Sequence, residues 1–65
     1  MNRPRKTRDV WTLHGKYAWN GIGQWEELTS ELSRSDIIAR RREYLAEDRY
    51  LTAVKITKTR ESINP

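Results

Sequence analysis

Few side chains in this 65-residue chain could do acid–base chemistry. His14 is the single histidine, and it is the side chain whose ordinary pKa lies nearest to neutral pH. Glu26, Glu27 and Glu31 form an acidic cluster, and paired carboxylates exchange protons or bind a metal when a concave, partly desolvated site shifts their pKa. A domain of this size offers little concavity, and the chain has no cysteine. The sequence therefore predicts no enzyme, no cofactor and no metal site.

The segment from Trp19 to Trp25 has the residue types of a recognition loop. Asn20 and Gly21 form a strong hairpin-turn signal because both residues tolerate positive φ. Ile22 lies between two glycines at the predicted tip. Tryptophans often anchor interfaces, so we expect Trp19, Ile22 and Trp25 to bind a partner protein, with Ile22 outermost. The alternative is that Trp25, and Trp19 with it, packs beneath a helix and completes the core.

A second candidate site is basic. Residues 1–8 carry four basic groups and no acid, whereas the other 57 residues carry nine of each, so the net charge of +4 lies in this segment. A basic segment can hold a phosphate backbone without reading its sequence. The competing interpretation is a disordered terminus over 1–8. The residues that would contact nucleic acid in this alternative are Arg3, Arg5, Lys6, Arg8, Arg40 and Arg42.

Hydrophobic patterns predict the strands that position the loop. Residues 10–19 alternate between bulky and polar side chains, which is typical of a β-strand, and residues 24–29 predict a returning strand. Gly15 lies on the bulky side of the first strand and indicates a bulge or room for a large neighbour. Trp25 and Leu28 are three residues apart, which breaks the alternation and indicates an irregularity in the second strand.

A helix and a last strand follow. Ser33 and Asp36 have the spacing of a capping box, and apolar residues from Ile37 to Leu45 recur with the helical period. Asp36 and Glu43 are both placed to pair with Arg40 along this helix. Residues 50–59 alternate again, with Tyr50, Thr52, Val54 and Ile56 on one side and Leu51, Ala53, Lys55 and Thr57 on the other.

The order strand, strand, helix, strand predicts an α+β fold. We expect a three-stranded antiparallel sheet of order 2-1-3 with one helix on one face, forming a single domain over 9–61 with a loose end over 62–65. The expected core consists of Trp11, Leu13, Tyr17, Ile37, Ile38, Tyr44, Leu45, Val54 and Ile56. The other sheet face would meet solvent or a second copy of the chain, so a homodimer is a further expectation. Apolar runs of two to three residues predict no membrane span and a cytoplasmic location.

Three stretches of the chain resemble small phage and prophage proteins. They are Gln24-Trp25-Glu26-Glu27-Leu28-Thr29, then Ser33-Arg34 with Ala39-Arg40-Arg41-Arg42-Glu43-Tyr44, and Ala53-Val54-Lys55-Ile56-Thr57-Lys58-Thr59-Arg60-Glu61. The chain departs from that pattern at Gln24, where glycine is usual, and at Arg41, where an apolar residue is commoner. The layout is also similar to that of the small RNA-polymerase inhibitor of T7-like phages. The resemblance implies a phage origin, and the similar layout supplies the precedent of a small phage domain that docks on a larger host machine. We therefore expect an accessory protein of the host cytoplasm that binds a larger host or phage protein and modulates it, inhibition being the expected effect.

Overall fold

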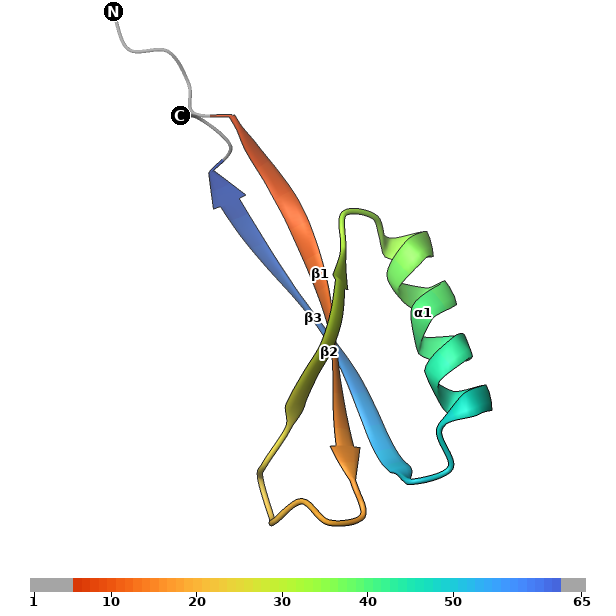
Figure 1. The fold of residues 1–65 in the computed structure, drawn as a ribbon. Helices are drawn as coiled ribbons and strands as arrows, with labels where there is room; N and C mark the ends of the chain where they lie inside the picture. Colours follow the sequence, from red (N-terminus) through yellow and green to blue (C-terminus); the bar gives the residue numbers. More distant parts are fainter. Residues whose placement is uncertain (1–5, 63–65) are drawn as a thin grey trace, which may run out of the picture.

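The protein is an α+β fold in which one helix covers one face of a three-stranded antiparallel sheet (Figure 1). The structure is a computed structural model and describes residues 6–62. Its elements are β1 (Thr7–Tyr17), β2 (Glu26–Glu31), α1 (Arg34–Glu47) and β3 (Leu51–Ser62). The sheet order is β2-β1-β3, so the predicted fold class and strand order are confirmed.

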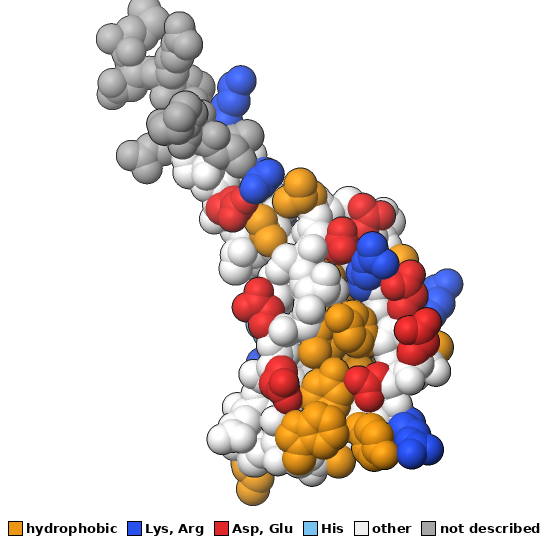
Figure 2. Space-filling model, in the orientation of Figure 1, with side chains coloured by type: hydrophobic (Ala, Val, Ile, Leu, Met, Phe, Trp, Pro, Cys, Tyr) orange, Lys and Arg blue, Asp and Glu red, His pale blue; other side chains and the backbone are white. Residues whose placement is uncertain are grey.

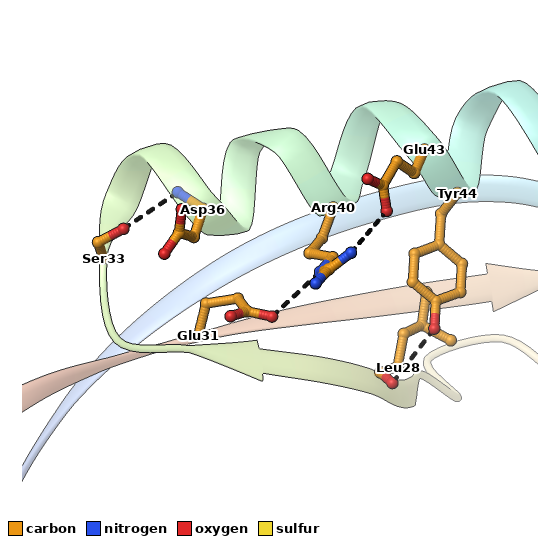
Figure 3. Close-up of polar contacts among 7 residues, drawn as sticks. All are labelled: Leu28, Glu31, Ser33, Asp36, Arg40, Glu43 and Tyr44. Atoms are coloured by element: carbon orange, nitrogen blue, oxygen red, sulfur yellow. Dashed lines mark hydrogen bonds and ion pairs between the residues drawn. The ribbon is translucent and has the colours of Figure 1, made fainter.

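Helix α1 begins at the predicted cap and is tied to β2 (Figure 3). The Ser33 hydroxyl accepts a hydrogen bond from the Asp36 N–H at 3.1 Å, which satisfies one of the unpaired donors of the first turn. Farther along, the Arg40 guanidinium bonds Glu31 of β2 at 3.1 Å. The Tyr44 hydroxyl donates to the Leu28 carbonyl at 3.4 Å. These contacts fix α1 over β2.

Strands β1 and β3 continue together beyond β2 and α1 as a two-stranded arm (Figure 1). The arm makes the molecule elongated, with extents of 53 × 24 × 15 Å. Arg8 donates to Glu61 at 2.6 Å across the arm, and Arg60 bonds Asp9 at 3.4 Å. Thr7 and Arg8 therefore belong to the sheet and not to the predicted terminal segment. The rest of that segment, apart from Lys6, and the last three residues of the chain lie outside the described residues.

A β-bulge in β2 turns Leu28 toward the helix. Leu13 pairs with Thr29 and His14 pairs with Glu27, so Leu28 is the extra residue and the predicted irregularity is confirmed. Gly15 makes room for it: a Cβ built there would lie 2.6 Å from the Leu28 Cδ1 atom. The expectation of space for a large neighbour at Gly15 is therefore confirmed as well.

A second bulge, in β3, corrects the predicted side of one core residue. Lys16 pairs with Ala53 and Tyr17 with Leu51, so Thr52 is the extra residue, and its hydroxyl donates to the Lys16 carbonyl at 2.8 Å. A bulge shifts the alternation of side chains by one residue. Leu51 therefore reaches Gly15, its Cδ1 atom 2.6 Å from the built Cβ. The prediction that Leu51 faces away from the helix was wrong.

The core is narrower than the sequence predicts. Leu13 and Ile37 are fully buried, and most of the other expected core residues are half-buried. Leu45 is 52% exposed, so its assignment to the core was wrong. The helix turns Ile37 and Tyr44 toward the sheet, and Leu45 lies about 100° further round the helix from Tyr44. Because β2 is short, the sheet does not extend far enough to cover both the side of the helix that carries Tyr44 and the side that carries Leu45.

We predict that Gly15→Ala destabilises the fold by about 1–2 kcal/mol, because the added methyl group displaces the ends of Leu28 and Leu51 from a small core. Thermal or urea unfolding monitored by circular dichroism measures the change. Gly21→Ala is the matched control, since the nearest atom there is the Oε1 of the exposed Gln24 side chain. Equal unfolding midpoints for Gly15→Ala and the natural protein would contradict the packing described here.

Candidate functional site

The loop between β1 and β2 consists of two successive turns. Asn20 closes the first: its N–H donates to the Tyr17 carbonyl at 3.0 Å, and its Oδ1 accepts from the Tyr17 N–H at 2.7 Å. Gln24 closes the second, with its N–H donating to the Gly21 carbonyl at 3.1 Å. Within 6–62 the only positive φ, 77°, is at Gly23. The prediction of a tight turn at Asn20 and Gly21 was wrong, because the Asn20 side chain instead bonds the end of β1.

The two loop tryptophans lie in different surroundings. Trp19 stacks on Tyr17, with ring centroids 4.7 Å apart and planes at 6°. Trp25 is half-buried, and the Lys55 ammonium lies 4.5 Å from its ring centroid. Lys55 is paired with His14, on the sheet face that α1 leaves uncovered. The structure therefore does not bring Trp19 and Trp25 into one surface, and Ile22 is 100% exposed in the loop.

An exposed aromatic cluster stands at this end of the sheet, and we call Tyr17, Trp19 and Tyr50 the aromatic end. Trp19 is 65% exposed and Tyr50 50% exposed, with their ring centroids 5.9 Å apart. The Ala18 N–H donates to the Tyr50 carbonyl at 3.0 Å, which fixes the two backbones beside each other. Figure 2 shows hydrophobic side chains gathered where the β1–β2 loop meets the connection from α1 to β3.

Asp48 organises the connection that carries Tyr50. Its N–H donates to the Tyr44 carbonyl at 2.9 Å and ends α1, and its Oδ1 accepts from the Tyr50 N–H at 3.1 Å. Burial, followed by the neighbouring Asp48 carboxylate, raises the pKa of Tyr17 to about 12, and Glu26 adds to the effect. The phenol therefore stays protonated at neutral pH within a negative local potential.

A hollow of about 630 Å³ adjoins the aromatic end. Its lining residues come from the last turns of α1 and the following connection: Arg40, Glu43, Tyr44, Glu47, Asp48, Arg49 and Tyr50. The Arg49 guanidinium carbon lies 5.1 Å from the Tyr50 ring centroid, and Arg49 donates to the Tyr50 hydroxyl at 3.1 Å. The hollow is thus lined by two tyrosines and by three acidic and two basic side chains.

The acidic cluster does not converge on a reaction centre. Glu31 bonds Arg40, and Glu26 and Glu27 are neighbours on β2, where consecutive side chains alternate between sheet faces. His14 shares a 2.8 Å hydrogen bond with Thr57 on the uncovered face. Over 6–62 there is no group of three or more His, Cys, Asp or Glu side chains that could hold a metal ion.

The basic candidates are dispersed. Arg3 and Arg5 lie outside the described residues, Lys6 is exposed, and Arg8 bonds Glu61 on the arm. Arg40 bonds Glu43 at 2.9 Å, as predicted, and its other partner is Glu31 rather than Asp36 (Figure 3).

These two contacts of Arg40, Glu43 first, raise its pKa above the ordinary value. Arg42 is exposed on α1, whereas Arg8 lies on the arm, which continues beyond the helix (Figure 1), so the described members of this set do not form one patch.

Comparisons with protein-family models, curated proteins and solved structures find no match to this chain. The resemblance to phage proteins therefore stays an expectation from the residues. No helix in the described part of the chain is long and apolar enough to cross a membrane.

Trp19 was identified from the sequence, but its neighbour Tyr50 was missed, and so was Asp48, which contacts Tyr50. Tyr50 was predicted within the last strand, and it instead precedes β3 and is exposed. The available signal was its position directly after the polar end of the helical pattern, at Asp48 and Arg49.

We predict that Asp48→Asn lowers the pKa of Tyr17 from about 12 toward its ordinary 10.0. A raised pKa in the folded state means that folding stabilises the protonated phenol, so stability falls as the pH rises from 10 to 12. Ultraviolet titration of phenolate absorbance measures the shift, and Tyr17→Phe identifies the transition. An identical titration of Asp48→Asn and the natural protein would refute the role of Asp48.

Proposed function

We propose that this protein is a non-enzymatic accessory protein that binds another protein through its aromatic end. The observation that carries the proposal is the exposed Trp19 ring, which stacks on Tyr17 and lies beside Tyr50. Tryptophan and tyrosine are enriched among the residues that supply most of the binding energy at interfaces. Their exposure here supports a role in contact.

Preorganisation of Trp19 strengthens the proposal. Binding an immobilised side chain costs less entropy than binding a freely rotating one. The parallel stack on Tyr17 holds the indole at one angle, and aromatic pairs of this kind contribute about 0.5–1.5 kcal/mol. The two turns closed by Asn20 and Gln24 hold the loop backbone in the free protein.

The resemblance to small phage proteins suggests the kind of partner. In this proposal the partner is a larger host or phage protein, and binding modulates its activity, with inhibition as the expected effect. A chain of 65 residues can act in this way because occupying a surface needs no reaction centre of its own. The acidic side chains of β2, which do not converge, and the small core support a binding role over catalysis.

Nucleic-acid binding is the second candidate function, and the arm is the observation that favours it. The arm carries Arg8 and Arg60, Lys6 directly precedes it in the sequence, and Lys58 lies at its base opposite Trp11. Glu61 and Asp9 pair with the two arginines, however, and Lys58 lies over the Trp11 ring. The described basic side chains of the arm are thus partly neutralised, so we rank this function second.

We predict that Trp19→Ala weakens binding of the partner at least about thirtyfold, the loss expected for a central aromatic anchor. The test is affinity capture from lysate of a phage-sensitive bacterium, comparing the proteins retained by the natural chain with those retained by each variant. Trp25→Ala, on the other sheet face, is the control and should retain the partner. Capture that is equal with and without the Trp19 indole would remove the aromatic end from consideration.

For the second candidate, we expect weak retention on double-stranded DNA that disappears at moderate salt. Removing residues 1–5 should abolish that retention without changing the capture of a protein partner, because the arm and the aromatic end lie at opposite ends of the molecule (Figure 1). Gel-shift measurements over a salt series test this. Tight, salt-resistant DNA binding would make nucleic-acid binding the leading function.

A further inference from the structure

Three of the six exposed or half-buried aromatic rings of this chain, including two of its three tryptophans, carry a cation from the chain itself. The Lys58 ammonium lies 5.3 Å from the Trp11 ring centroid, and Lys55 lies 4.5 Å from that of Trp25. Arg49 lies 5.1 Å from that of Tyr50. Such contacts are attractive because the face of an aromatic ring is negative, most of all in tryptophan.

Trp19 is the exception among the tryptophans. No Lys or Arg within 6–62 lies over its ring, whose recorded neighbours are the rings of Tyr17 and Tyr50. The indole is nevertheless 65% exposed and held at a fixed angle. A cation from another molecule can therefore contact the Trp19 ring in the way that lysines of this chain contact Trp11 and Trp25.

The charges around the aromatic end favour a basic partner. Asp48 and Glu26 lie close enough to the Tyr17 hydroxyl to act on its ionisation. Glu43 and Glu47 line the adjoining hollow, in which Arg40 is already bonded to Glu31 and Glu43. No described residue forms an ion pair with Glu47. Arg49 lies over the Tyr50 ring at this end, but the four carboxylates outnumber Arg40 and Arg49. This end is therefore locally acidic although the chain as a whole carries a charge of +4.

We propose that the aromatic end recognises a basic segment of its partner protein. One arginine or lysine side chain lies on the exposed face of Trp19, and its charge is directed to Asp48 and Glu47. The hollow of about 630 Å³ receives the residues next to it. This inference rests on the proposed function, because it names the chemistry of the partner at the same site.

Other peptide chemistries fit this surface less well. An acidic segment would be repelled by the carboxylates of Glu43, Glu47 and Asp48. A purely apolar segment would remove water from Glu47 and Asp48 without giving them a new partner, and burying unpaired charge is costly. A guanidinium suits both the Trp19 ring and the carboxylates, because it stacks on an aromatic face and bonds carboxylates.

The direct test is fluorescence anisotropy with fluorescein-labelled peptides of alternating glycine and arginine, glutamine or glutamate. We expect saturable binding of the arginine peptide, at least tenfold tighter than that of the glutamine peptide, and no binding of the glutamate peptide. Trp19→Leu should weaken arginine-peptide binding at least tenfold and Glu47→Gln severalfold. Trp25→Leu is the matched control and should leave the affinity unchanged.

The contrary outcomes are equally distinct. Equal binding of the arginine and glutamine peptides, or equal affinity with and without the Trp19 indole, would overturn the inference. Glu47→Gln changes only an exposed helical side chain, so it keeps the test valid if Trp19→Leu fails to fold.

Capture of a protein partner that depends on Trp19, without arginine-peptide binding, would overturn this inference while leaving the proposed function intact. Arginine-peptide binding together with Trp19-independent capture would instead overturn the proposed function.

Discussion

The absence of a side chain at Gly15 is the constraint on which the rest of the structure depends. β1 is the central strand, and at Gly15 the side chains of Leu28 and Leu51 approach it from the two flanking strands. These two side chains point toward Gly15 because β2 has a bulge at Leu28 and β3 has a bulge at Thr52. The bulge at Thr52 also places Tyr17 opposite Leu51 and Ala18 beside Tyr50, so the packing around Gly15 determines the geometry of the aromatic end.

The chain has few apolar residues, so the small core and the exposed aromatic surface have to be explained together. Only Leu13 and Ile37 among the described residues are fully buried hydrophobic side chains. In such a fold a tryptophan would contribute most to stability beneath the helix. Trp19 instead lies at the end of the sheet, where its stacking on Tyr17 orders it without burying it. That placement supports the proposed contact with a partner.

The sequence predicts the elements, the strand order and the helix cap, because these follow from periodicity and local hydrogen bonding. It also indicates irregular pairing from Gly15 and from the spacing of Trp25 and Leu28. It does not predict the bulge at Thr52, since no local pattern marks it, and that bulge reversed the expected side of Leu51. Trp19 was a predicted site residue, whereas its neighbour Tyr50 is 31 positions away and depends on strand register.

The central claim is that packing around Gly15 holds Tyr17, Trp19 and Tyr50 together in the free protein. Nuclear Overhauser spectroscopy of the unbound chain tests it most directly. The account predicts cross-peaks from the Trp19 indole protons to both tyrosine rings, with the Tyr17 ring protons shifted upfield by the stacked indole. A Trp19 indole with no cross-peaks to either ring, in a protein that is otherwise folded, would contradict the account.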